Sequence, residues 1–297
     1  MAKNFQKTLL LVTILATFAS GCRSTDDYKK FAEAGNNFAK ANNELLNSAE
    51  KMAVNTTSER MLSDRIIKGE PELNIKDRDN FTRRYEENFS KSDIERLELI
   101  KELRNHNRLL FTYFNTLLKL AGSDSSVRTQ TAVTSIANQL QDSGNRLISL
   151  GNLGKLPSVT GIVLDARIRG TIRGELEKRK ESIYREITIQ EKLLKVIGNS
   201  MEDDAKVTRQ LQEYRLVLLP LFESLDKIKQ DDWLEKRYEV MTQDSKVIDQ
   251  INEASGNLAE FREMFIASVG GEVTSKQINT FVRKTNSFSK EIVVNKP

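Results

Sequence analysis

Residues 28–52 read YKKFAEAGNNFAKANNELLNSAEKM, and this stretch decides the fold. One set of positions in it alternates spacings of three and four residues: Tyr28, Phe31, Gly35, Phe38, Asn42, Leu45, Ala49 and Met52. This seven-residue rhythm places a mostly apolar stripe along one face of an α-helix, and such a stripe needs a helical partner. Gly35 permits close approach of a partner backbone, and Asn42 can fix the register at a cost in stability. We therefore expect this helix to dock on the rest of the chain.

The chain turns polar between residues 69 and 92, with Pro71 as the clearest helix breaker. Within this segment Phe81, Tyr85 and Phe89 recur at four-residue intervals, which places three aromatic rings on one face of a short helix. An exposed aromatic stripe would contact a ligand or a membrane, whereas a buried one would belong to the core. We expect these three rings to be core residues.

Helical spacing returns after Ser92, which with Glu95 resembles a capping box, and the helix behind it is expected to end at Gly122. A further helix around residues 133–147 is expected to end at Gly151.

The remaining sequence predicts four more helical stretches. Residues 158–198 contain no proline and predict one helix of about forty residues. Ser200 is expected to cap the next helix, which Pro220 should kink. Another long helix is expected over 231–269, and a last one from Thr274, followed by a loose tail from residue 291.

The N-terminus has the pattern of an export signal. Lys3 and Lys7 precede an apolar run over residues 8–18, and small residues follow it. The run is too short for a permanent membrane-spanning helix, which takes roughly 20 residues. The sequence therefore predicts a signal peptide over residues 1–21.

The residues Ala19-Ser20-Gly21-Cys22 resemble the lipobox of bacterial lipoproteins. The resemblance covers only this motif. It implies that the thiol of Cys22 receives a diacylglycerol, that signal peptidase II cuts before it, and that Cys22 becomes the first mature residue. Two or more acyl chains would hold the chain stably on a membrane. The alternative is a small buried cysteine beside an ordinary signal peptide.

The residue after the acceptor cysteine bears on location. Arg23 stands there, and the resemblance to lipoproteins of Gram-negative enterics implies sorting to the outer membrane, because Asp at that position favours inner-membrane retention. Removal of the signal takes two lysines away, so the formal net charge of +4 falls toward neutrality. Together with the export signal, this argues against nucleic acid as a partner.

Composition agrees with long helices. The 297 residues include only 14 glycines and 4 prolines, and no segment shows sustained period-two alternation. The sequence predicts an all-α fold, an elongated and mostly antiparallel bundle of long helices with coiled-coil-like seams. The expected segments are 1–21 (lipoprotein signal peptide), 22–68 (lipidated N-terminal helical segment), 69–92 (polar connection with a short aromatic helix), 93–290 (helical bundle) and 291–297 (loose C-terminal tail).

Residue counts limit the possible chemistry. One cysteine excludes an intramolecular disulfide framework and a Cys-rich zinc site, and one histidine excludes His-pair metal chemistry. We expect His106 to be a surface or seam residue rather than a metal ligand with Glu102. We expect no cofactor and no metal. The dipeptides Glu181-Ser182 and Glu223-Ser224 resemble the catalytic Glu-Ser of peptidoglycan-cleaving lipoproteins, but the glycine-rich context of those enzymes is absent.

The most charge-skewed segment runs from residue 167 to residue 185. Its basic residues, which form a possible patch for an anionic partner, are Arg167, Arg169, Arg173, Lys178, Arg179, Lys180 and Arg185. Such a helix face could bind lipid headgroups, lipopolysaccharide, cell-wall polymer or an acidic protein. The alternative is an ordinary solvated face with intrahelical ion pairs, which we favour.

The leading functional hypothesis is a lipid-anchored, non-catalytic envelope protein that acts by contact as a scaffold, adaptor or accessory subunit, with an envelope protein as partner. The alternatives are an envelope hydrolase that cleaves peptidoglycan through a Glu/Asp pair and a carrier of a hydrophobic ligand between helices. An enzyme predicts a cleft with a strongly perturbed carboxyl group. A carrier predicts an apolar cavity of several hundred Å3. An adaptor predicts an exposed apolar or basic patch.

Overall fold

The structure, a computed structural model, describes residues 25–67, 75–122, 127–151, 171–222, 228–243, 246–270 and 273–294. The helices are α2 (Thr25–Ile67), α3 (Ile75–Arg84), α4 (Lys91–Gly122), α5 (Val127–Leu150), α6 (Thr171–Gln212), α7 (Leu219–Leu221), α8 (Gln230–Met241), α9 (Lys246–Gly270) and α10 (Ser275–Val294). Two π-helical segments, η2 (Tyr85–Ser90) and η3 (Glu213–Leu218), continue α3 into α4 and α6 into α7. No strand occurs in these ranges, so the all-α class is confirmed.

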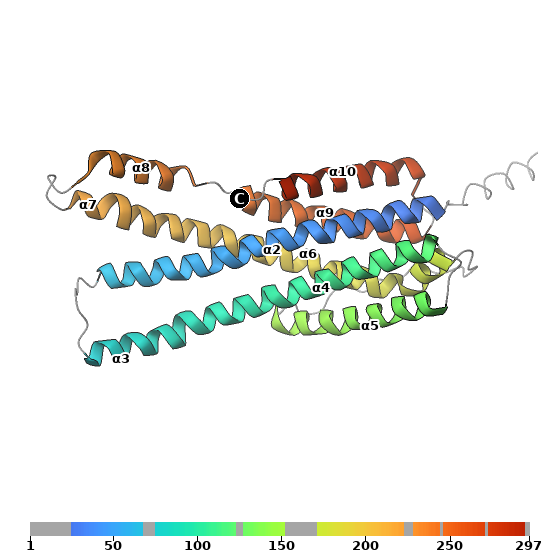
Figure 1. Cartoon of the computed structure of the whole chain (residues 1–297), viewed down its shortest axis with the longest axis horizontal. Coiled ribbons are helices and arrows are strands. Elements are labelled where there is room, and N and C mark those ends of the chain that lie inside the picture. Colours follow the sequence, from blue (N-terminus) through green and yellow to red (C-terminus); the bar gives the residue numbers. More distant parts are fainter. Residues whose placement is uncertain are drawn as a thin grey trace, which may run out of the picture.

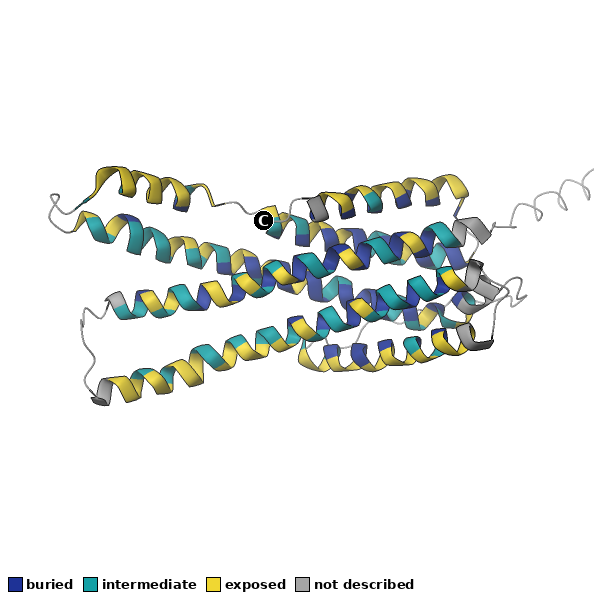
Figure 2. Ribbon diagram, viewed as in Figure 1, coloured by how far each residue is buried: buried dark blue, intermediate teal, exposed yellow. Residues whose placement is uncertain are grey.

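The long helices run along one axis, and consecutive long helices mostly reverse direction (Figure 1). This confirms the elongated, mostly antiparallel bundle. Helix α2 packs against α4, α6 and α10, while α9 packs against α6. The buried residues gather in the half of the bundle where α2, α4, α5, α6, α9 and α10 lie together (Figure 2). In the other half the helices separate, and α3 and α8 are mostly exposed.

The seam predicted in α2 is largely confirmed. Phe31, Phe38, Leu45 and Ala49 are buried in the core. Burying large apolar side chains stabilises the fold by about 1.5–3 kcal/mol each. The ring of Phe31 stacks on the ring of Phe261 from α9, with centroids 4.6 Å apart. An aromatic cluster thus joins the N-terminal helix to the C-terminal part of the bundle.

Gly35 lies where α2 meets aromatic side chains from α4 and α9. A Cβ atom at this position would lie 2.8 Å from Cδ2 of Phe114 and 2.9 Å from Cζ of Phe261, which is closer than carbon atoms approach. The tight packing at Gly35 is therefore against aromatic side chains, and not against the partner backbone that the seam predicted. Asn42 is fully buried, and neither side-chain amide atom has a hydrogen-bond partner in the described structure. Its neighbour Asn43 instead accepts a 2.9 Å hydrogen bond from Nδ2 of Asn107 on α4.

The aromatic residues of the 69–92 segment are not core residues, so that prediction is wrong. Tyr85 is 44% exposed, and Phe81 and Phe89 are only half-buried. The helix that carries them packs mainly against its own neighbours in the chain, because the bundle opens at this end.

The predicted helix start at Ser92 is also wrong. No glycine or proline occurs between residue 75 and residue 121, so α3, η2 and α4 form one continuous helical run across the expected boundary at residue 92.

One helix boundary on α6 differs from expectation. The helix continues through Ser200, because no breaker follows it and Met201 is buried on the core side. The predicted cap at Ser200 is therefore wrong.

Residues 158–170 of the expected forty-residue helix lie outside the described residues. Pro220 was expected to kink the helix that follows Ser200. Before Pro220 the α-helix changes into the π-helical segment η3, consistent with the loss of a backbone N–H at proline.

The expected helix over 231–269 is in fact two helices. Helix α8 ends at Met241, Thr242 adopts a non-helical ψ of 12°, and α9 begins at Lys246. Helix α10 begins beside Thr274, as expected. Thr274 Oγ1 accepts from the backbone N–H of Gln277, whose Oε1 accepts from the N–H of Thr274.

The expected loose tail is helical as far as Val294, so its predicted start at residue 291 is wrong. Burial of Ile292 against the core accounts for the extra turn.

Candidate functional site

Helix α2, the first described helix after the predicted lipid anchor, begins at one end of the bundle. Residues Ala19-Ser20-Gly21-Cys22 and Arg23 lie outside the described residues, and α2 begins at Thr25, three residues after Cys22. Helix α2 then runs 43 residues toward the opposite end of the bundle. At ~1.5 Å per residue this is about 65 Å.

The end opposite the start of α2 exposes large apolar side chains on η3, α7 and α8. We call this set the distal apolar surface: Leu218, Leu221, Phe222, Leu234 and Tyr238. Phe222 is 72% exposed and Tyr238 is 70% exposed, whereas aromatic side chains are largely buried in most proteins. Figure 2 shows α8 as almost wholly exposed. Exposed apolar groups gathered at one place are typical of contact sites.

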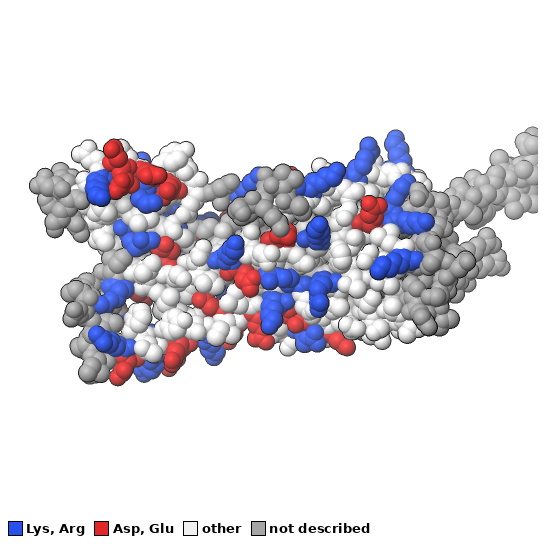
Figure 3. Space-filling view, in the orientation of Figure 1, with Lys and Arg blue, Asp and Glu red and all other residues white. Residues whose placement is uncertain are grey.

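One hydrogen bond fixes α8 against η3. Trp233 Nε1 donates to the backbone carbonyl oxygen of Val217 at 3.0 Å. That carbonyl lies in the π-helical turn just before Pro220, and both Val217 and Val240 are buried. The contact fixes α8 against η3, two of the elements that carry the exposed apolar residues. Acidic side chains also gather over α8 in Figure 3.

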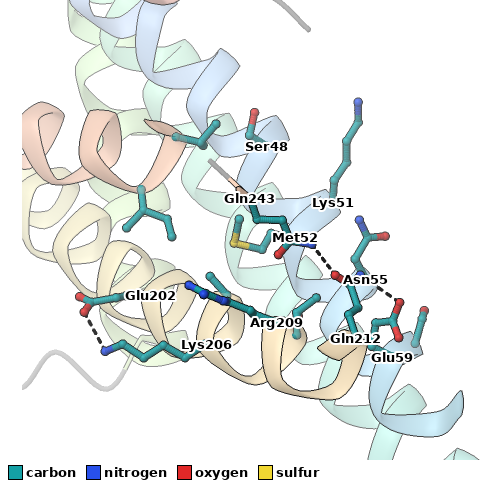
Figure 4. Close-up of a pocket in the computed structure, with 15 residues that line it drawn as sticks. Ser48, Lys51, Met52, Asn55, Glu59, Glu202, Lys206, Arg209, Gln212 and Gln243 are labelled. Atoms are coloured by element: carbon teal, nitrogen blue, oxygen red, sulfur yellow. Dashed lines mark hydrogen bonds and ion pairs between the residues drawn. The ribbon is translucent and has the colours of Figure 1, made fainter. Parts of the chain in front are cut away.

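A cavity of about 790 Å3 opens near the middle of the bundle, between α2, α6 and the start of α9 (Figure 4). Its lining residues come from three places in the sequence: Ser48, Lys51, Met52, Asn55, Ser58 and Glu59; Glu202, Ala205, Lys206, Thr208, Arg209 and Gln212; and Gln243, Val247 and Ile248. The volume falls within the roughly 300–1,000 Å3 of pockets that bind small organic molecules.

Ion pairs neutralise the carboxylates of the cavity. Glu202 accepts from Lys206 at 2.8 Å, and this contact lowers the pKa of Glu202 and raises that of Lys206. Glu59 accepts two hydrogen bonds from Nη2 of Arg215, at 2.8 and 3.0 Å. Gln212 also donates to Glu59 at 3.1 Å. Neither carboxylate is left free to act as a base or to attract a cation.

A second polar group is enclosed in the core. His106 Nε2 lies 2.9 Å from Oε2 of Glu186, and His106 Nδ1 lies 2.6 Å from Nε2 of Gln190. Because the Gln190 amide nitrogen is a donor, Nδ1 accepts and the proton on Nε2 is donated to Glu186. Arg185 Nη1 donates to the other Glu186 oxygen at 2.6 Å. His106 is therefore a seam residue, as predicted.

The suggested metal pair of His106 with Glu102 does not form. Glu102 instead accepts from Ser143 at 2.7 Å and from Arg146 at 2.9 Å. In the described part of the chain, no group of three His, Cys, Asp or Glu side chains is placed to hold a metal ion.

Of the seven basic residues of the 167–185 segment, the four whose side chains are described do not share one exposed face. Arg167 and Arg169 lie outside the described residues, as does the side chain of Arg173. Lys180 is 2% exposed, and Arg179 donates to Thr134 Oγ1 at 2.8 Å.

Arg185 pairs with Glu186, as described above. Lys178 alone among the described members is exposed. Of the two Glu-Ser dipeptides, Glu181 is exposed on α6, and Glu223-Ser224 lies outside the described residues.

Comparison with protein-family models, curated proteins and solved structures gives no significant match to this chain. None of the described helices combines the length and the apolar content that a membrane crossing requires. The distal apolar surface and the cavity were not predicted from the sequence, because both depend on which helix faces the bundle leaves uncovered.

Proposed function

We propose that this chain is a bacterial envelope lipoprotein that acts by contact, as a scaffold, adaptor or accessory subunit. Acylated Cys22 would tether it to a membrane, and the resemblance at Arg23 favours the outer membrane where the organism is Gram-negative. The observation that carries the proposal is the distal apolar surface, about 65 Å along α2 from the tether. A partner that covered these side chains would remove them from water, which favours association.

The geometry of the two ends supports a spacing role. Helix α2 is continuous from Thr25 to Ile67, and the ion pair of Glu59 with Arg215 ties it to η3, so α2 spans most of the distance between tether and contact surface. The opposite end of the bundle is where the helices separate and where Phe222 and Tyr238 are exposed. A protein partner that met this end would be held at a fixed height above the membrane.

The anchor is tested by replacing Cys22 with Ala. The wild-type chain should fractionate with membranes, and its N-terminal peptide should carry the mass of the acyl groups. The Cys22→Ala chain should carry no acyl mass and should no longer be processed before residue 22. Ser24→Ala, two residues further on, is the matched control and should behave as wild type. An unmodified Cys22 thiol in the mature wild-type chain would contradict the proposal.

A further inference from the structure

We propose that the cavity between α2, α6 and α9 binds an amphiphile with a single anionic head group, held by Arg209, and with an apolar tail along the helix faces. This inference does not depend on the proposed contact function. It rests on which lining charges are already neutralised, on the apolar part of the lining and on the volume of the cavity.

Within the described ranges, the lining side chains that lack an oppositely charged partner are positively charged. Glu202 is paired with Lys206, and Glu59 is held by Arg215, which is not itself a lining residue. Lys51 and Arg209 have no carboxylate partner among the described residues. The site therefore favours an anion.

Arg209 is the better placed of the two cations. Among the described residues its Nη2 donates only to the sulfur of Met241, at 3.4 Å, and a thioether is a weak acceptor. An arginine fork with free donors forms strong paired hydrogen bonds to carboxylate or phosphate oxygens. In Figure 4, Arg209 lies on α6 between the Glu202–Lys206 pair and Gln212, facing the side of the cavity where Met52 and Gln243 lie.

The apolar part of the lining lies next to this cation. Met52 from α2 and Ala205 from α6 are half-buried, as is Val247, while Ile248 is buried at the start of α9. These side chains pack on the main core cluster, so they form a wall that is already folded without ligand. A flexible apolar chain laid along this wall would lose water-exposed area, and methionine adapts readily to irregular shapes.

The test uses the expected mature sequence, residues 22–297, produced without the signal peptide and with Cys22→Ala, so that it carries neither acyl chains nor the apolar run of residues 8–18. Binding is measured by titration calorimetry. Dodecanoate and dodecyl phosphate are the anionic probes, and the tighter of the two identifies the head group as carboxylate or phosphate. Dodecyltrimethylammonium has the same tail and the opposite charge. We expect saturable binding of at least one anionic probe at one site per chain, and at least tenfold weaker binding of the cationic one.

Substitutions then locate the head group. Arg209→Gln should weaken binding of the anionic probe about tenfold, and Arg209→Lys, which keeps the charge but loses the paired hydrogen bonds, should weaken it less. Arg283→Gln is the matched control, because Arg283 is exposed on α10 outside the cavity. The proposal is overturned if neither anionic probe binds, if the cationic probe binds as tightly, or if Arg209→Gln and Arg283→Gln have equal effects. Helix content measured by circular dichroism shows whether each variant is folded.

Discussion

His106 and Glu186 form a fully buried pair 2.9 Å apart, which joins α4 to α6 across 80 residues of sequence. Gln190 donates to the other imidazole nitrogen and Arg185 to the other carboxylate oxygen. This polar cluster pairs His106 of α4 with Glu186 and Gln190 of α6, so it forms in only one register of the two helices. We infer that it helps to fix how α4 and α6 align.

Replacing Glu186 with Ala should lower the free energy of unfolding by about 3 kcal/mol, because His106 loses a buried acceptor and a cavity remains. Urea denaturation followed by circular dichroism measures the change. Glu181→Ala is the matched control on the exposed face of α6 and should change stability by no more than about 0.5 kcal/mol. Equal losses of stability in the two variants would show that the buried His106–Glu186 pair stabilises the fold no more than an exposed glutamate does.

Two glycines should respond in opposite directions to replacement by alanine. Gly35→Ala should destabilise the chain by about 1–3 kcal/mol, because the new methyl group would collide with the rings of Phe114 and Phe261. Gly256→Ala should stabilise it by about 0.5–1 kcal/mol, because nothing lies within 4 Å of the added atom and alanine favours helix. Thermal melting of both variants tests the pair, and a stabilising Gly35→Ala would refute the close packing described here.

The buried Lys180 side chain should lower the stability of the fold, so replacing it with an apolar residue should raise that stability. Its side chain is 2% exposed, and its Nζ has no hydrogen-bond partner in the described structure. Lys180→Met keeps the length of the side chain and removes the buried polar group, so we expect stability to rise by about 1 kcal/mol or more. Lys178→Met, on the exposed face of the same helix, should have little effect. A lower melting temperature for Lys180→Met than for wild type would show that the ammonium group has a partner.

Glu102 should contribute stability that depends on pH. Burial alone would raise its pKa, but hydrogen bonds from Ser143 and Arg146 and the charge of Arg146 outweigh burial and lower the pKa below 4.5. A carboxyl group with a lowered folded-state pKa stabilises the fold above the unfolded-state pKa, and this contribution disappears as the pH falls through the folded-state pKa.

Glu102→Gln should therefore reduce stability by about 1 kcal/mol or less near neutral pH, and the difference from wild type should shrink by about pH 3. Urea midpoints across that range measure it. Glu98→Gln, an exposed position on α4, is the control. A difference between Glu102→Gln and wild type that stays constant with pH would rule out the ionised carboxylate as its source.

The sequence was most informative where side-chain spacing alone decides the structure. The stripe through Phe31 and Phe38 correctly predicted a packed seam, whereas Gly35 packs against aromatic rings and not against the predicted partner backbone. The sequence was misleading at Tyr85, which was expected in the core. A four-residue aromatic spacing shows that side chains share a helix face, but not whether another helix covers that face. The sequence also misled at Ser200, because a residue suited to a cap can equally lie within a continuous helix.

The candidate sites were less predictable than the fold. The cavity brings together Lys51 and Arg209 from α2 and α6 with Val247 from α9, and no local pattern shows that these residues meet. The distal surface had a weak signal. Leu234 and Tyr238 are four residues apart on α8, so they share a helix face, but their exposure depends on the opening of the bundle.

The contact function is tested most directly by photocrosslinking in the cells that produce the protein. A photoreactive phenylalanine analogue is placed at Tyr238 in the distal apolar surface and, as a control, at Lys195, which is exposed on α6. We predict a discrete adduct with an envelope protein from position 238, none from position 195, and loss of the adduct when Phe222 and Leu234 are both replaced by Ser. No adduct from position 238, or the same adducts from both positions, would contradict the account.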